Sequence, residues 1–480
     1  MDAGEADRAA PQESGTESEN DVFNLAEMVL LSRQSSARPT IAACTTKHGA
    51  AREHRNTFEH HDSTAMSGTE GHPPMSIKDT CAIVGVGATD YFKRGQSFPE
   101  TELSMACTAI LAALADAGLT IADLDGFSIY SNSCDPATVG AELGVPEIRW
   151  ATSTTSGGGG CVGALGVAAA AINGGMATTV VSLMTLQQLN KRLGGSAVGG
   201  VLGYAMMSEG SSPYGGSGVP PSAAFTANNG LLSPGHSFAQ IAGRHMHLYG
   251  TKREHFAEVC MSTRDNAIKR PTALRTEPLT LDDYFNARMI NDPLCLFDYT
   301  MESDGAVAVI TTSTERARDL RQTPVLISAA NHGGAGRWGP ALFKYFQSPD
   351  EYFTSSGHRP VAKRMYEMAG VGPSDVDVAL LYDHFSPMVI MQLEDYGFCP
   401  IGEGGAFVAD GNIRYGTGSI PVNTHGGNLS EAYIIGMTHV REAVEQLRGT
   451  AVNQVAGAEV ALVTGGPAGL PVSGAILRRG

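Results

Sequence analysis

An internal duplication constrains the fold of this chain more than any other feature of its sequence. Residues 117–130 (AGLTIADLDGFSIY) match residues 369–382 (AGVGPSDVDVALLY) over their whole length. The matched positions are an Ala-Gly pair, an apolar residue, two aspartates and a final tyrosine, namely Asp123 with Asp375, Asp125 with Asp377, and Tyr130 with Tyr382. Each copy has the pattern of a helix end, a turn and an apolar strand. The chain is therefore predicted to contain two similar halves.

Both halves continue with the same order of elements. A glycine-rich turn comes next in each, SGGGG at 156–160 and THGG at 424–427, and a helical pattern and a buried strand follow. Strands that alternate with helices indicate an α/β fold in which helices cover the sheets. We expect the two halves to span residues 78–325 and 326–480.

Two segments interrupt this plan. Residues 186–290 begin as a loop rich in glycine and serine and continue as helical segments. Long insertions of this kind often cover an active site. Residues 1–77 are polar and lack periodicity, so we expect either a disordered tail or translation upstream of the true start, which would then be Met66 or Met75.

Composition and charge exclude several function classes. The formal net charge of −16 argues against nucleic acid or an anionic membrane surface as the main partner. No stretch reaches the length of a membrane span, and the acidic N-terminus lacks the apolar core of a signal peptide. The eight cysteines form no C-x-x-C pair, so neither a zinc site nor a disulfide framework is indicated. We therefore expect a cytoplasmic protein with reduced thiols and no metal, in which His245, His247 and His255 form a polar helix face.

Four motifs, in their order along the chain, resemble those of the thiolase superfamily, in its sterol-carrier-protein and lipid-transfer-protein branch. They are ESDGAVAVI (302–310), YDHF (382–385), NTHGG (423–427) leading to Tyr433, and VTGGPAG (463–469). The matching motifs cover almost all of residues 80–480. The resemblance implies a duplicated thiolase fold with αβαβα layers and a helical loop domain inserted in the first half.

The departures from the family pattern decide the chemistry. A thiolase needs a nucleophilic cysteine at the N-terminus of a buried helix, and the matching position is Gly158. Cys161 lies about one turn away and is read as a small apolar helix residue, with a displaced nucleophile as the alternative. The second thiolase cysteine corresponds to Val463, the catalytic histidine to Tyr433, and the first residue of the Asn-Glu-Ala-Phe motif to Tyr382. Acyl transfer through a covalent thioester is therefore not expected.

Two tyrosines that face one cavity suit proton transfer without a covalent intermediate. A phenol has a pKa near 10, and we expect helix N-termini and nearby histidines to lower it. Cleavage of the Cα–Cβ bond of a β-hydroxyacyl-CoA needs one group to take the hydroxyl proton and another to protonate the thioester enolate. Backbone N–H groups at the glycine turns could stabilise the enolate oxyanion.

This pattern, with tyrosine at both positions and no catalytic cysteine, resembles the thiolase-like aldolases of bacterial steroid side-chain degradation. The resemblance implies a retro-aldol release of a short acyl-CoA and a ketone from a steroid side chain. It also implies a homodimer and a separate acyl-CoA-binding subunit with an OB-fold and a zinc ribbon. The coenzyme A thioester is the substrate, and no other cofactor is expected.

The remaining candidates are assigned to substrate binding or the oxyanion site: His425, Gly158, Asp383 and His384. His425 either contacts the thioester, tunes Tyr433 or only stabilises the turn. Asp383 and His384 are adjacent, so on a strand they point to opposite faces and one of them is structural. Tyr130 is expected to be a core residue, and the NHGG stretch at 331–334 either lines the cavity or forms a surface turn.

Two alternative functions stay open at this point. The chain could be an acyl-CoA acyltransferase with an unusual nucleophile, or a thiolase-like subunit that binds lipid or acyl-CoA without catalysis. Labelling of Cys161 by an acetyl-CoA analogue would indicate the first alternative. Ligand binding without turnover, unaffected by a change at Tyr433, would indicate the second.

Overall fold

The computed structural model describes residues 76–130, 134–154, 158–188, 230–231, 233–334, 353–466 and 471–480. The predicted N-terminal tail and the loop-like part of the insertion fall almost entirely outside these residues, and the proposed domain limits stay predictions. Within the described residues a central sheet has the strand order β10-β11-β12-β9-β1-β8-β5-β3-β4, with the short β2 (Phe92–Lys93) paired to β8. Its strands are β1 (Cys81–Ala88), β3 (Gly126–Tyr130), β4 (Trp150–Ser153), β5 (Thr179–Leu186), β8 (Ser303–Ser313), β9 (Val325–Gly333), β10 (Val378–Leu380), β11 (Val460–Gly465) and β12 (Val472–Arg479).

Strand pairing repeats between the two halves. β3 lies parallel to β5 in the first half, as β10 lies parallel to β11 in the second. β5 is antiparallel to β8 and β8 to β1, and the second half repeats this with β11, β12 and β9. The halves join where β1 meets β9, at Ala82 with Leu326 and Ile83 with Val325. The predicted duplicated α/β fold is confirmed.

The matched aspartates have the same structural task in both halves. The carboxylate of Asp125 accepts the backbone N–H of Thr179, at the start of β5, at 2.8 Å. The carboxylate of Asp377 accepts the backbone N–H of Val460, at the start of β11, at 2.9 Å. Each aspartate directly precedes its own strand and fixes the start of that strand to the start of the neighbouring parallel strand. This shared role explains why the duplicated segments have the same residues here.

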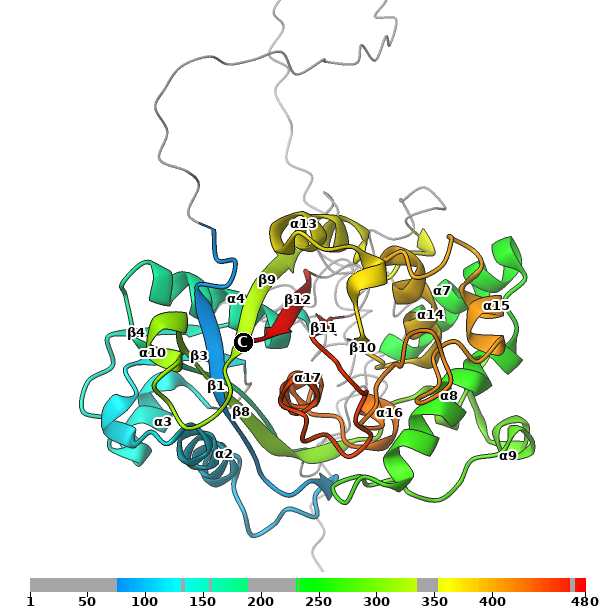
Figure 1. Cartoon of the computed structure of the whole chain (residues 1–480). Helices are drawn as coiled ribbons and strands as arrows, with labels where there is room; N and C mark the ends of the chain where they lie inside the picture. Colours follow the sequence, from blue (N-terminus) through cyan, green and yellow to red (C-terminus); the bar gives the residue numbers. More distant parts are fainter. Residues whose placement is uncertain are drawn as a thin grey trace, which may run out of the picture. The chain divides into compact units, whose positions relative to one another are not determined.

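Helices form layers on both sides of the sheet (Figure 1). α2 (Glu102–Ala117) packs on the outer face of the first-half strands, and α13 (Arg359–Ala369) packs on β9 and β12 of the second half. α4 (Gly159–Asn173) and α17 (Met437–Arg448) contact strands of both halves, so they form the layer between them. α4 consists largely of glycine and alanine, whose small side chains let the strands of both halves approach it closely.

The insertion contributes helices that pack against the second half. They are α7 (Pro234–Tyr249), α8 (Arg253–Ile268) and α9 (Leu281–Asn286), followed by the hairpin β6 (Met289–Asn291) and β7 (Leu294–Cys295). α8 contacts α14 (Ser386–Asp395), α15 (Gly404–Ala409) and α16 (Gly427–Ser430), and these helices share one apolar core (Figure 1). The other short helices are α3 (Pro136–Leu143) and α10 (Thr314–Ala317). No helix among the described residues is long and apolar enough to cross a membrane.

The predicted polar face of histidines in the insertion is wrong for His245. This side chain is buried on α7, and its two ring nitrogens bond Thr251 Oγ1 at 2.8 Å and Glu394 Oε1 at 3.1 Å. The two partners come from elements that sequence periodicity does not bring together. His245 therefore joins the insertion to α14 within the core.

Candidate active site

Tyr382 and Tyr433 meet at their hydroxyl groups. The two Oη atoms are 3.0 Å apart, within hydrogen-bond distance, although the residues are far apart in sequence. Tyr382 follows β10, and its backbone N–H donates to Thr464 Oγ1 at 2.8 Å. Tyr433 lies in the turn between α16 and α17, and its backbone N–H donates to Ser303 Oγ at 3.0 Å. The two backbones are thus held by side chains from β11 and β8.

Burial controls the acidity of both phenols. It raises the pKa of Tyr433 to about 12, although the hydrogen bond from Tyr382 lowers it in part. Burial also raises the pKa of Tyr382 well above 10, and the neighbouring Tyr433 adds to this effect. The expectation that helix N-termini and histidines lower these pKa values is therefore wrong, because loss of hydration outweighs them. At neutral pH both phenols carry their protons.

Gly158, at the position of the thiolase nucleophile, lies directly against Tyr382. A Cβ atom placed on Gly158 would be 2.3 Å from both Cζ and Oη of Tyr382. A Cβ atom on Gly436 would also be close to the ring, at 2.8 Å from Tyr382 Cδ2, and Gly436 has a φ of +81°. The phenol therefore occupies the space beside Gly158 at the N-terminus of α4, the position that the sequence resemblance matched to the thiolase nucleophile.

Cys161 is buried in the layer between the two halves. Its exposed fraction is 0%, and it packs in the apolar core that also contains Tyr382. Burial raises the pKa of this thiol far above its usual range. A thiol that keeps its proton is a poor nucleophile. These features favour the structural interpretation of Cys161 over the displaced nucleophile.

Asp383 anchors the glycine turn. Its carboxylate accepts the backbone N–H groups of Asn428 at 2.8 Å and Leu429 at 3.2 Å, at the start of α16. It also lies 3.1 Å from His439 Nε2. A Cβ atom on Gly427 would be 2.1 Å from Asp383 Oδ2, which requires glycine there. Of the adjacent pair, Asp383 is thus the residue with a structural task.

His384 has the opposite character. Neither of its ring nitrogens makes a hydrogen bond of ordinary geometry among the described residues, although the side chain is buried and the backbone of Tyr382 is close enough to affect its pKa. Its ring centroid lies 5.0 Å from that of Tyr382 and 4.5 Å from that of Phe238. Burial lowers its pKa to about 3, so the imidazole is neutral, with one donor and one acceptor. An unpaired buried polar group next to Tyr382 is available to a ligand.

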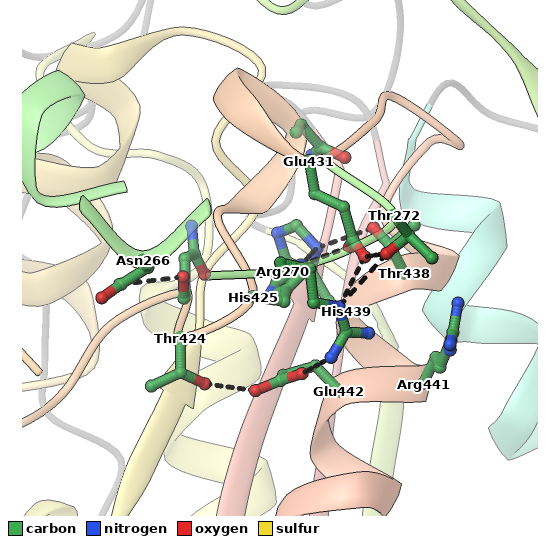
Figure 2. Close-up of polar contacts among 12 residues, drawn as sticks. Asn266, Arg270, Thr272, Thr424, His425, Glu431, Thr438, His439, Arg441 and Glu442 are labelled. Atoms are coloured by element: carbon green, nitrogen blue, oxygen red, sulfur yellow. Dashed lines mark hydrogen bonds and ion pairs between the residues drawn. The ribbon is translucent and has the colours of Figure 1, made fainter. Parts of the chain in front are cut away.

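His425 lies beneath the turn, in a polar network (Figure 2). Its Nε2 is 3.2 Å from His439 Nδ1 and 3.9 Å from Glu431 Oε2. Burial lowers the pKa of His425 well below 6.5. Within the described part of the chain it bonds to neither tyrosine, which favours support of the turn over contact with a thioester.

The other sequence candidates lie nearby. Tyr130 is buried in the same central core as Tyr382, as expected of a core residue. His332 belongs to β9 and not to a surface turn, and it packs against α4, where a Cβ atom on Gly163 would be 2.9 Å from its Cγ. No group of metal-ligating side chains is found among the described residues.

A cavity of about 580 Å³ lies elsewhere, between α7 and the β6–β7 turn. His236 and Gln240 of α7 line it together with Asn291 and Asp292. Neither tyrosine of the pair contributes to its wall. We therefore place the candidate active site at the paired phenols and the unsatisfied imidazole beside them. The cavity at α7 is not assigned to this site.

Comparison with known proteins identifies the family to which the chain belongs. Residues 344–476 match the family model "Thiolase C-terminal domain-like". The chain is 40% identical over 413 residues to a 17-hydroxy-3-oxo-4-pregnene-20-carboxyl-CoA lyase of Mycobacterium tuberculosis, covering 84% of this chain and 100% of the relative. It is 39% identical over 407 residues to a steroid side-chain-cleaving aldolase of Thermomonospora curvata, covering 84% and 98%. The chain belongs to the thiolase-like aldolase family.

A solved structure extends this similarity to the fold. The Ltp2-ChsH2(DUF35) aldolase superposes with a TM-score of 0.74 at 36% identity, covering 84% of this chain and 99% of that chain. The thiolase-like aldolase assignment agrees with the site, because the space for a thiolase nucleophile is filled by a phenol. The predicted family membership is confirmed.

Sequence reasoning missed residues that support the tyrosine pair. Gln392 of α14 donates to the backbone oxygen of Tyr382 at 2.8 Å and accepts from Thr464 Oγ1 at 2.6 Å. A glutamine within the otherwise apolar stretch SPMVIMQL was a signal that could have found it. Asn428 was also missed, and both polar atoms of its buried side chain lack partners among the described residues. It follows the two glycines of the turn directly.

Proposed function

We propose that this thiolase-like aldolase cleaves the Cα–Cβ bond of a β-hydroxyacyl-CoA on a steroid side chain, releasing a ketone and a short acyl-CoA. The observation that carries the proposal is the 3.0 Å contact between the hydroxyls of Tyr382 and Tyr433, the two residues that the sequence resemblance matched to thiolase catalytic groups. The names of the two curated relatives, a steroid-CoA lyase and a steroid side-chain aldolase, supply the substrate class.

Two neutral phenols can perform this reaction as a proton relay. The substrate hydroxyl passes its proton to Tyr382, while Tyr382 passes its own proton to Tyr433 across their hydrogen bond. The O–H electrons form the carbonyl of the ketone, the Cα–Cβ bond breaks, and its electrons form the thioester enolate. In the same concerted step Tyr433 gives its own proton to the enolate carbon as it takes the proton of Tyr382, so neither phenol ever holds two protons. Both tyrosines end in their starting states, so the raised pKa values are compatible with turnover.

The direction of the relay follows from the two environments. The hydrogen bond between the two phenols lowers the pKa of Tyr433 and raises that of Tyr382, so Tyr433 is the better proton donor to carbon. His384, whose ring lies against Tyr382, can direct a neutral N–H at the thioester oxyanion. A preorganised donor in a dry site stabilises developing negative charge more than it would in water.

We further propose that the chain works with a separate DUF35-type subunit that binds acyl-CoA, and that it forms a homodimer. The first part is supported by the composition of the similar solved structure, whose name joins Ltp2 with ChsH2(DUF35). The second is supported by β4, which ends the sheet and pairs on one side only with β3 among the described residues. Light scattering of the chain alone and with a DUF35 subunit measures both associations.

The test of the function is a turnover assay with a steroid β-hydroxyacyl-CoA and the chain co-expressed with its DUF35 subunit. We compare wild type with Tyr382→Phe, Tyr433→Phe and Cys161→Ala, and we follow release of ketone and short acyl-CoA. The proposal expects both Phe variants to lose activity about 100- to 10,000-fold, while Cys161→Ala keeps it. Loss confined to Cys161→Ala would establish the acyltransferase mechanism instead. An inactive wild type that still binds the substrate would indicate a binding subunit.

A further inference from the structure

A buried arginine lies beside the turn that carries Tyr433 (Figure 2). Arg270, in the segment after α8, is 3% exposed and contacts three carboxylates. Its Nε donates to Glu431 at 2.8 Å, and its Nη1 lies 2.9 Å from Glu442 and 2.6 Å from Glu445. Glu431 is two residues before Tyr433, whereas Glu442 and Glu445 belong to α17. The guanidinium thus joins the turn to the central helix.

The same segment also binds the backbone of the turn. The N–H of Leu274 donates to the carbonyl oxygen of Glu431 at 2.9 Å, and the N–H of Arg275 donates to that of Ser430 at 3.1 Å. Thr272 Oγ1 donates to the Glu431 carboxylate at 2.6 Å. The residues that follow α8 therefore hold the turn through main chain and side chain together.

The other arm of the turn is held from α8 itself. The side-chain amide of Asn266 donates to the carbonyl oxygens of Val422 and Asn423, both at 3.1 Å. Asn453 connects the two sides by donating to the carbonyl oxygens of Asn266 at 2.8 Å and Thr424 at 2.7 Å. Both ends of the segment from Val422 to Tyr433 are thus fixed by the helical insertion.

Charge makes Arg270 the central member of this network. Glu431 and Glu442 are fully buried, and Arg270 is the cation that forms direct ion pairs with both carboxylates among the described residues. Arg441 forms its ion pair with Glu445 and interacts with Glu431 only through space, without a direct contact. A planar guanidinium can bond several carboxylates at fixed angles, whereas a lysine presents one point charge. Loss of Arg270 would leave two buried carboxylates without their cation and release the turn.

We propose that Arg270 is a positioning residue for Tyr433, through which the helical insertion sets the distance between the two phenols. Arg270 touches neither tyrosine and acts through Glu431 and the turn. The activity arm of its test rests on the proposed function, and the spectroscopic arm does not.

The activity arm compares Arg270→Met and Arg270→Lys with a control variant, Arg414→Met. Arg414 pairs with Glu258 at 2.6 Å and Asp265 at 3.4 Å of α8, but does not contact the turn. A displacement of a catalytic group by about 1 Å costs about 100-fold in rate. We expect kcat of Arg270→Met to fall by about that factor with KM nearly unchanged, a smaller loss for Arg270→Lys, and no loss for Arg414→Met.

The spectroscopic arm follows the NMR signal of Tyr433 in protein with isotope-labelled tyrosine Cζ, assigned by its absence in Tyr433→Phe. Circular dichroism establishes that each variant is folded. We expect Arg270→Met to move the Tyr433 signal and Arg414→Met to leave it in place. If Arg270→Met does not fold, Glu431→Gln replaces it, since it removes the ion pair and keeps the side-chain shape.

The outcomes separate the two proposals. A folded Arg270→Met or Glu431→Gln protein with an unmoved Tyr433 signal would overturn the positioning role. A moved signal together with an inactive wild type would uphold the positioning role and refute the aldolase function. Equal losses of kcat in Arg270→Met and Arg414→Met would also contradict the positioning role, because they would reflect general destabilisation of α8.

Discussion

The phenol of Tyr382 fills the space that a side chain at Gly158 would occupy. A Cβ atom on Gly158 would lie 2.3 Å from Tyr382 Oη, closer than any real contact allows. A side chain at position 158 and a tyrosine at position 382 therefore exclude each other in this packing. A larger residue can be placed at position 158 only if Tyr382 moves or is replaced.

The first prediction concerns Gly158→Cys. The new side chain must displace a buried phenol, so we expect overpacking to lower the free energy of unfolding by about 1–3 kcal/mol. The double variant Gly158→Cys/Tyr382→Asn should recover part of this loss, because the smaller amide frees the space. Denaturant unfolding of the two single variants and the double variant measures the coupling. Additive effects in this cycle would show that the two side chains do not compete.

The second prediction concerns the pH dependence of turnover. Tyr433 has a folded pKa of about 12, above the unfolded value near 10. Its contribution to stability is therefore fully present below about pH 10 and is lost as the pH rises through about 12. We expect no limb from Tyr433 ionisation in kcat/KM between about pH 6 and 9. A limb in this range that disappears in Tyr433→Phe would contradict the neutral relay.

The third prediction separates ligand binding from structure at His384. Its nitrogens have no partner among the described residues, and Phe238 and Phe385 surround the ring. We expect His384→Phe to be at least as stable as wild type, since an unsatisfied buried polar group is removed, but to lose activity. His245→Phe is the matched control, and it should lose about 2 kcal/mol because it removes the imidazole that bonds both Thr251 and Glu394. Thermal unfolding and turnover of both variants test the difference, and an active His384→Phe enzyme would remove His384 from the site.

The fourth prediction concerns Glu442, the carboxylate of α17 that contacts Arg270. Burial raises its pKa from 4.5 to about 7 although Arg270 opposes this shift. Because the folded pKa is the higher one, its stabilising contribution is fully present below about pH 4.5 and is lost as the pH rises through about 7. In Glu442→Gln, we expect the free energy of unfolding to fall less than in wild type as the pH rises over this range. Glu445→Gln should shift this dependence to lower pH, because the Glu445 charge helps to raise the pKa of Glu442, and an identical pH profile for all three proteins would refute this assignment.

Local patterns in the sequence predicted much of the fold. The matched aspartates and tyrosines at 117–130 and 369–382 indicated the duplication, because two copies of one backbone path need the same side chains at the same positions. In each copy the aspartate, Asp125 or Asp377, accepts a backbone N–H at the start of the next parallel strand. The resemblance of the YDHF and NTHGG motifs to those of thiolases also brought Tyr382 and Tyr433 forward as candidates.

Tertiary packing decided what these candidates can do. The sequence by itself determined the two halves, the missing nucleophile and the two tyrosines. Only the folded structure placed Tyr382 against Gly158, assigned Asp383 to the turn and left His384 unpaired, and placed Arg270 behind Tyr433. The same packing raised the phenol pKa values that we had expected to be lowered. Contacts and desolvation depend on neighbours that are distant in the chain, and the spacing of residues along a sequence does not encode them directly.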